Sequence, residues 1–374
     1  MNKFKEIPDE ILTAFVFEGE PVSAERITDG HINNTFALTF ESEGGNKRKY
    51  LLQELNTNVF RQPEALMNNV VGVTEFLRKK ITAAGGDPER ECLTVIPSAD
   101  SKPYYISKDG KFWRCFNFIE NTYTLQRVES AESFAASARA FGNFQCLLAD
   151  YPAETLAETI PNFHNTVSRF ADFKKAVEDN LSGRADNCRE EIKFILSRES
   201  DCSVLVDMTA KGELPLRVTH NDTKLNNVMF DNETGVGICV VDLDTVMPGL
   251  ALYDFGDSIR FGASTAAEDE PDLEKVHFSP EYFEAYTDGF LSTAGRALTD
   301  NEIKYLPFSS KLMTLECGMR FLGDYINGDT YFKTDYPEHN LVRARTQLKL
   351  VSEMEDKMQI MTDTVSRIRI KYGI

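Results

Sequence analysis

Several kinds of residue and pattern are scarce or missing in this chain of 374 residues. Its seven cysteines are scattered and include no CxxC pair; they lie at positions 92, 115, 146, 188, 202, 239 and 317. An odd number of dispersed cysteines suits neither a disulfide framework nor a zinc site, so we expect free thiols and a reducing compartment. The sequence also lacks a C/S-x-P-x-R motif, which argues against a sulfatase.

Positive charge is scarce as well. The chain has 41 lysines and arginines against 59 aspartates and glutamates, a net charge of −18. Such acidity argues against partners that are nucleic acids or anionic membranes. No apolar run approaches the ~20 residues of a membrane-spanning helix. The run from Ile11 to Phe17 is flanked by acids and lacks a cleavage site, so it predicts an amphipathic helix. We therefore expect a cytoplasmic protein that is a monomer or a weak homodimer.

The most informative stretch runs from Pro215 to Asp244. A short apolar strand leads into His220-Asn221-Asp222, and Asn227 follows five residues after the aspartate. Two further strands, 228–230 and 236–241, flank the turn residues 232–235 and end at Asp242. Strands joined by such a turn pair antiparallel. The pattern therefore predicts that Asn227 lies opposite Asp242, with Asp222 on the loop before the hairpin.

This set of residues is what phosphoryl transfer needs. We predict that Asp222 orients or deprotonates an attacking hydroxyl, while Asn227 and Asp242 hold Mg²⁺ on the phosphates of ATP. H-x-D-x-x-x-x-N is the catalytic-loop pattern of kinase-like folds, and a short pattern alone can arise by chance. Lys224 can neutralise the transferring phosphoryl group, with a solvated surface lysine as the alternative. Asp244 can hold an acceptor hydroxyl.

Longer motifs resemble one family. HNDTKLNN and CVVDLDTVMPGLALYDFGDSIRFGA resemble the N-acetylhexosamine 1-kinases, within the aminoglycoside phosphotransferase and choline kinase group, and so do ETIPNFHNT and LECGMRFLGDYINGDTYFKT. The resemblance implies an α+β, two-lobed, protein-kinase-like fold. A small antiparallel-sheet N-lobe is expected over residues 1–118 and a larger, mostly helical C-lobe over 119–374. It also implies ATP-dependent phosphorylation of the C1 hydroxyl of N-acetylglucosamine or N-acetylgalactosamine.

The expected nucleotide-covering loop, residues 29–35, has no GxGxxG motif. Asn33, Asn34 and Thr35 can donate hydrogen bonds to phosphate or sugar oxygens, which predicts nucleotide binding. His31, in the same loop, is predicted to contact the substrate. An ordinary polar hairpin loop is the alternative.

The usual phosphate-binding lysine is also missing. Gln53, or Glu54 if the register shifts, occupies its place in the strand that begins near residue 49. Lys49, Lys80 or a second metal ion remain open as replacements. Phe118 and Glu120 fall where kinase-like folds place the linker between lobes, which holds adenine by backbone groups, and we predict that they border the nucleotide. A core position is the alternative for the aromatic residue.

Arg320 lies within an apolar helical segment, LECGMRFL, where a charge is costly unless it is paired. The resemblance implies that Arg320 and Tyr331 contact the sugar; without it, Arg320 reads as a structural ion pair. Another small-molecule kinase, for choline, an aminoglycoside or a different sugar, is the nearest alternative. A nucleotide-binding pseudoenzyme is a second, which Gln53 favours.

Other residues are predicted to support the site. The resemblance implies that an aspartate here, Asp254 or Asp257, holds the catalytic loop by hydrogen bonds, and we expect both to be structural supports. His164 is predicted to be a satisfied structural histidine. Apolar spacing predicts helices over 63–80, 130–150, 161–180, 188–210, 312–325 and 340–372. The last of these shows near-heptad spacing, and we expect it to pack on the helical lobe rather than form a coiled-coil dimer.

Overall fold

The computed structural model describes residue 4, residues 6–28 and residues 32–374, and these form two compact units. The sheet unit comprises the described residues up to 123, with 154–160 and 229–247. The helical unit comprises 124–153, 161–228 and 248–374. The lobe boundary at residue 118 stays a prediction. His31, predicted to bind substrate, lies outside the described residues.

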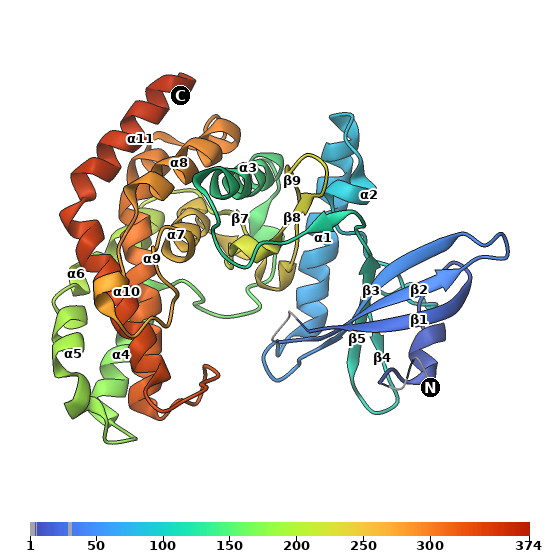
Figure 1. Cartoon of the computed structure of the whole chain (residues 1–374), viewed down its shortest axis with the longest axis horizontal. Coiled ribbons are helices and arrows are strands. Elements are labelled where there is room, and N and C mark those ends of the chain that lie inside the picture. The colour runs from blue at the N-terminus through green and yellow to red at the C-terminus, as the bar shows by residue number, and fades with distance from the viewer. Residues whose placement is uncertain (1–3, 5, 29–31) are drawn as a thin grey trace. The chain divides into compact units, whose positions relative to one another are not determined.

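An antiparallel sheet forms most of the sheet unit (Figure 1). Its strands stand in the order β1 (Glu20–Ile27), β2 (Asn34–Glu41), β3 (Lys47–Leu55), β5 (Phe112–Asn117) and β4 (Tyr105–Ile106). Alternate residues of β2 are buried, as expected for a sheet with one face on a core. That core includes Phe36, Leu38, Phe40, Tyr50, Leu52 and Trp113.

The remaining elements of the sheet unit are short apart from one helix. They are η1 (Asp9–Thr13), α1 (Pro63–Ala83), α2 (Pro88–Glu91), η2 (Ala153–Thr155) and η5 (Leu243–Thr245). The amphipathic helix predicted near residue 11 is thus the 3₁₀ helix η1. A small sheet joins β6 (Thr122–Tyr123), β8 (Val228–Asp231) and β9 (Gly237–Val240). The β8–β9 hairpin matches the predicted one, and Gly235 takes a positive φ of 67° in its turn.

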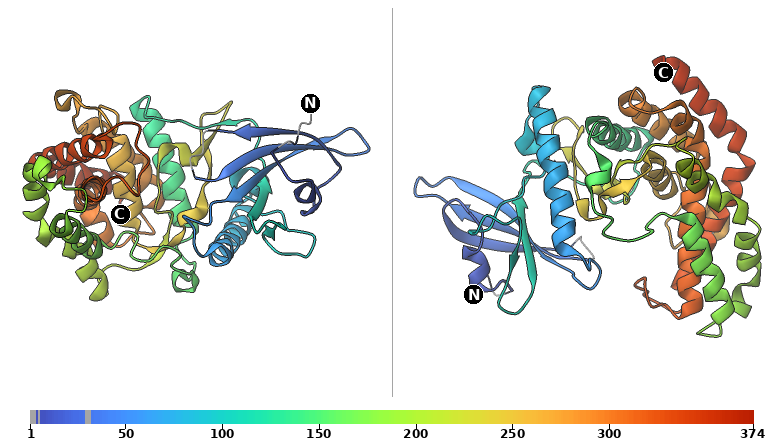
Figure 2. Two further views of the ribbon diagram at one scale, coloured as in Figure 1. Left: turned by 90° about the horizontal axis from the view of Figure 1, so that it is seen from below. Right: turned by 180° about the vertical axis from the view of Figure 1, so that it is seen from behind.

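The helical unit is built around α9 (Figure 2). Its helices are α3 (Ala131–Leu147), α4 (Thr166–Asp179), α5 (Arg189–Leu196), α6 (Glu199–Ala210), α7 (Ala251–Gly262), α8 (Pro280–Ala294), α9 (Asp300–Asn327), α10 (His339–Asp356) and α11 (Met358–Tyr372). Short 3₁₀ turns are η3 (Ala185–Cys188), η4 (Leu225–Asn227) and η6 (Leu273–Lys275). Strand β7 (Arg217–Thr219) pairs with β10 (Met247–Gly249).

Several helix bounds differ from the prediction, and the helix predicted over 312–325 is the second half of α9, which begins at Asp300. Helix α4 begins only at Thr166, because the Asn165 side chain accepts a hydrogen bond from the N–H of Ser168 and caps the helix there. The helix predicted over 188–210 is two helices, α5 and α6. The helix predicted over 340–372 is broken at Lys357, so α10 packs on α9 while α11 packs on α8 and α9. Packing on the helical lobe, the expected arrangement, is confirmed.

Among the residues that the structure describes, no helix combines the length and the hydropathy of a membrane-spanning segment. All seven cysteines are free thiols.

Candidate functional site

Helix α7 holds the predicted catalytic loop. Asp254 Oδ1 accepts a hydrogen bond from the N–H of Asn221 at 2.8 Å, and its Oδ2 accepts from the N–H of His220 at 3.0 Å. Asp257 Oδ2 accepts from the N–H of Thr223 at 3.2 Å. Both aspartates therefore act as the predicted supports, and they leave the side chain of Asp222 to other partners.

The two supporting carboxylates differ in their electrostatic surroundings. Burial raises the pKa of Asp254, although His220 and the backbone N–H groups oppose it. Burial also acts to raise the pKa of Asp257, but Arg260, with Nε 2.8 Å from Oδ1, together with His164 and Lys224 lowers it by more. Asp257 is thus held as a carboxylate beneath the loop.

Three predicted site residues lie together in this loop. Lys224 Nζ is 2.9 Å from Asp222 Oδ1, and Asn227 Nδ2 donates to the backbone oxygen of Asp222 at 2.8 Å. Burial acts to lower the pKa of Lys224, but the Asp222 carboxylate together with Asp257 raises it by more. Since the amide nitrogen of Asn227 faces Asp222, its Oδ1 is the end left to bind a cation.

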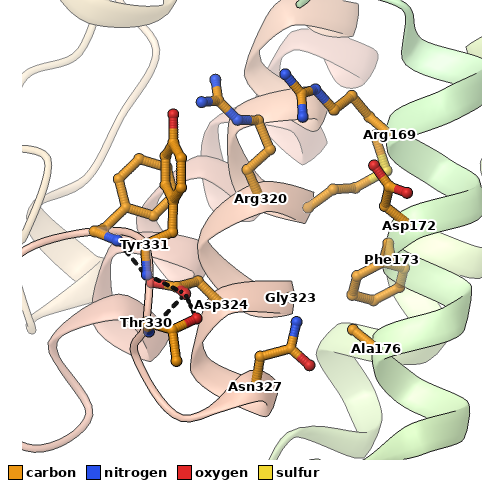
Figure 3. Close-up of a pocket in the computed structure, with 12 residues that line it drawn as sticks. Arg169, Asp172, Phe173, Ala176, Arg320, Gly323, Asp324, Asn327, Thr330 and Tyr331 are labelled. Carbon is orange, nitrogen blue, oxygen red and sulfur yellow. Dashed lines mark hydrogen bonds between the residues drawn. The ribbon is translucent and has the colours of Figure 1, made fainter. Parts of the chain in front are cut away.

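A cavity of about 180 Å³ lies between α4, α9 and the loop after α9, and Arg320 and Tyr331, two of the four residues predicted to bind the acceptor, line it. The guanidinium of Arg320 lies 5.7 Å from the ring centre of Phe163, 5.8 Å from that of Tyr331 and 5.5 Å from that of Phe332. Tyr331 is 66% exposed. Figure 3 shows the Tyr331 hydroxyl and the Arg320 guanidinium pointing to the same side of the pocket.

A second arginine lines this cavity and was not predicted. Arg169 on α4 donates from Nε and Nη2 to the backbone oxygen of Phe163, at 3.0 and 2.9 Å. Burial lowers its pKa, and the positive charge of Arg320 lowers it further. Figure 3 shows both guanidinium groups on one side of the pocket. The wall of the cavity therefore carries two neighbouring positive charges.

Asp324, also missed, fixes the loop that carries Tyr331. Its carboxylate accepts hydrogen bonds from the N–H groups of Thr330, Tyr331 and Phe332 at 2.8–2.9 Å. Asn340 Nδ2 donates to the same carboxylate at 3.0 Å. Gly328, in the left-handed region with φ 94°, ends α9 and turns the chain back. The one sequence signal for this role of Asp324 is an acidic residue four positions before the glycine that ends the helix.

His164 connects the catalytic loop to α9. Its Nδ1 lies 2.9 Å from Glu316 Oε1, and its Nε2 lies 3.1 Å from the backbone oxygen of Asn221. The prediction of a satisfied, buried histidine is confirmed.

Within the sheet unit, a buried network joins three predicted residues through Arg114, which the sequence did not single out. Arg114 Nη1 lies 2.5 Å from Asp244 Oδ1, and the two side chains are 2% and 4% exposed. Asp244 Oδ2 accepts from Asn33 Nδ2 at 2.9 Å. Gln53 accepts from Arg114 Nε at 2.9 Å and donates to Thr35 Oγ1 at 3.1 Å. The sequence signal for Arg114 was a charged residue within the mostly apolar strand FWRCFN, which the structure shows to be buried throughout.

Other predicted residues of the sheet unit have different surroundings. Asn34 Oδ1 accepts from Arg26, on the exposed side of the sheet. Lys49 Nζ lies 3.0 Å from Glu120 and 5.6 Å from the ring centre of Phe118, so the two linker residues share this lysine. Asp242 follows β9 by two residues, is exposed, and takes a positive φ of 58°.

The described residues contain no group of three or more His, Cys, Asp or Glu side chains placed to hold a metal ion. Mg²⁺ commonly takes one or two protein oxygens and completes its shell with water and substrate phosphates. The amide oxygen of Asn227, in the helical unit, and the carboxylate of Asp242, in the sheet unit, are each a type of ligand that Mg²⁺ takes.

A model of the phosphotransferase enzyme family, APH, matches residues 96–294. The chain is similar in structure to the amicoumacin kinase hAmiN in complex with AMP-PNP, Ca²⁺ and Ami, with 13% identity, 93% of this chain and 92% of that chain covered, and a TM-score of 0.56.

Two further solved structures are similar over nearly their whole length. For the microcompartment-associated aminopropanol kinase, identity is 16%, coverage is 94% of this chain and 97% of that chain, and the TM-score is 0.55. For choline kinase from Cryptosporidium parvum Iowa II, identity is 13%, coverage is 98% and 96%, and the TM-score is 0.53. At these identities the similarity shows the fold, and it confirms the predicted α+β, protein-kinase-like class.

Proposed function

Since the chain belongs to the phosphotransferase enzyme family, we propose that it is an ATP-dependent kinase that phosphorylates the C1 hydroxyl of an N-acetylhexosamine. The observation that carries the acceptor assignment is the setting of Arg320, whose guanidinium lies among three aromatic rings at the wall of a cavity.

The proposed chemistry starts at Asp222. Its carboxylate orients the acceptor hydroxyl and takes its proton as the oxygen attacks the γ-phosphorus in line; the bond from that phosphorus to the bridging oxygen breaks, and ADP leaves. Lys224, paired with Asp222, neutralises charge on the transferring group. Asn227 and Asp242 are the proposed ligands of Mg²⁺, which offsets negative charge on the nucleotide phosphates. Asn33, Asn34 and Thr35 are the proposed nucleotide contacts of the covering loop.

The cavity favours a neutral acceptor over a cationic one. Rings that could surround a quaternary ammonium such as choline already surround Arg320. Arg169 adds a second positive charge to the same wall and would repel an amine. A guanidinium presents a planar fork that can donate to two sugar oxygens at once. We therefore place the hexosamine against Arg320 and Tyr331.

A phosphate-transfer screen with ³¹P NMR of the product tests this proposal. We expect a sugar 1-phosphate from N-acetylglucosamine or N-acetylgalactosamine and no product from choline or kanamycin. Transfer to choline alone would sink the sugar assignment and leave the kinase assignment standing. No transfer to any acceptor, with ATP still bound, would support the pseudoenzyme that Gln53 favours.

Arg320→Lys tests the acceptor contact itself. Lysine keeps the charge but loses the fork, so KM for the hexosamine should rise about tenfold or more while KM for ATP stays nearly constant. Arg198→Lys is the matched control, because Arg198 also lies over a ring, that of Phe194, but does not line the cavity. Equal changes in KM for the sugar in both variants would remove Arg320 from the binding site.

A further inference from the structure

His164 lies between two hydrogen-bond acceptors, and a neutral histidine can donate to only one of them. Its two ring nitrogens face a carboxylate oxygen of Glu316 and a backbone carbonyl oxygen of Asn221, at 2.9 and 3.1 Å. When Glu316 is ionised, both partners can accept hydrogen bonds and neither can donate one. A neutral imidazole has one N–H and one lone pair, so it would set its lone pair against an acceptor, whereas an imidazolium donates to both.

The two partners of His164 lie next to the two groups that act in the proposed reaction, Asp222 and Arg320. The carbonyl of Asn221 is part of the peptide that joins Asn221 to Asp222, and Asn221 takes a positive φ of 65° there. Glu316 lies four residues before Arg320 in α9, on the same face of the helix. Glu316 is 1% exposed, and its negative charge helps to raise the pKa of Arg320 against the lowering effect of burial.

We propose that His164 is a positioning residue that acts as an imidazolium, locking the peptide before Asp222 to Glu316, the carboxylate whose charge stabilises that of Arg320. It sets the distance between the group that activates the hydroxyl and the group that holds the sugar. It touches neither substrate itself. This inference rests on the proposed function for its kinetic readout.

The electrostatic surroundings agree with the proposal. Burial lowers the pKa of His164, but the charge and hydrogen bond of Glu316 together with Asp257 raise it by more, to a net value above its ordinary one. Tyr253, whose ring centre lies 5.4 Å away, has a pKa raised by burial and stays neutral. A raised histidine pKa means that the link is intact at low pH and is lost as pH rises through that value.

His164→Gln is the first test. A glutamine cannot donate to both sides, so KM for the sugar should rise and kcat should fall, each by about tenfold, because small misplacements of reacting groups are costly. The dissociation constant of Mg-ATP, measured by calorimetry, should stay within about twofold. His277→Gln is the matched control, since His277 also faces a carboxylate and a carbonyl, Glu353 and the oxygen of Glu274, both at 2.9 Å, but at the surface. Wild-type kinetics in His164→Gln would overturn the proposal.

The Glu316→Gln variant tests whether His164 acts through its charge or only through its packing. In the wild type and in His277→Gln, kcat/KM for the sugar should fall at alkaline pH as His164 loses its proton. In Glu316→Gln a neutral histidine can accept from the new amide and still donate to Asn221, so this alkaline fall should disappear. A profile identical to that of the wild type would overturn the proposal.

A direct measurement covers the case in which His164→Gln does not fold. The chain has five histidines, so ¹⁵N NMR of the imidazoles in the whole protein is sparse enough to resolve. We expect His164 to be doubly protonated at pH 7, and a neutral ring there would sink the idea whatever the kinetics. If the screen finds that the wild type phosphorylates a different acceptor, the sugar assignment fails, and the same variants are then assayed with that acceptor.

Discussion

At the scale of single residues, Asp222 is held in place by groups that do not depend on its own carboxylate. The N–H groups of the loop donate to Asp254 and Asp257. Asp222→Asn should therefore keep the fold and the affinity for ATP while kcat falls about 10²-fold or more. Single-turnover assays with thermal melting check this. Near-wild-type turnover would take Asp222 out of the role of base.

Arg114 forms a buried ion pair with Asp244 in the sheet unit. Arg114→Leu would leave the buried carboxylate of Asp244 without its ion partner, which costs about 3–5 kcal/mol of unfolding free energy. Arg48→Leu, which breaks an exposed pair with Glu18, should cost at most about 1 kcal/mol.

Urea unfolding of both variants makes the comparison. The double variant Arg114→Leu with Asp244→Leu should recover part of the loss, since no buried charge then lacks a partner. Equal stability of Arg114→Leu and Arg48→Leu would mean that the pair in the sheet unit is not buried in solution.

At the scale of elements, α3 and α8 pack closely through glycine. A methyl group on Gly289 would lie 2.4 Å from the backbone oxygen of Ala135, too close for any Cβ, and a backbone atom cannot move aside cheaply. Gly289→Ala should therefore force α3 and α8 apart and cost about 1–3 kcal/mol.

Gly323→Ala in α9 is the contrasting substitution. The added methyl group would meet only the ring of Phe173, at 3.8 Å, an ordinary contact. Alanine favours a helix over glycine by up to about 1 kcal/mol, so this variant should be as stable as the wild type or more so. Thermal melts that rank the two variants the other way would contradict the packing.

At the scale of the whole molecule, the dominant property is the net charge of −18. Such a charge repels Mg-ATP, which is itself negative, and salt screens that repulsion over a Debye length of about 8 Å near physiological ionic strength. KM for ATP should fall as NaCl rises from about 10 to 150 mM, while KM for a neutral sugar should change little. Initial rates at saturating Mg²⁺ measure both. A sugar KM that follows salt as strongly as the ATP KM would point to a charged acceptor.

The sequence by itself determined what depends on residues close together in the chain. The spacing of His220, Asp222 and Asn227, and the turn chemistry of the hairpin that ends before Asp242, are local, so they predicted the loop and its strands. The supporting role of Asp254 was also foreseen, from the resemblance to a kinase family in the segment that follows the hairpin.

Only the tertiary structure decided which distant residues meet. His164 and Glu316 are separated by 152 positions, and no periodicity records their contact. Arg114 reads as one charge in an apolar strand, and only the folded sheet unit shows Asp244 as its partner. The break at Lys357 follows from packing on α8 and α9, since the apolar spacing continues through it. The energy of such contacts comes from burying groups together, and which groups are buried together is a property of the folded chain.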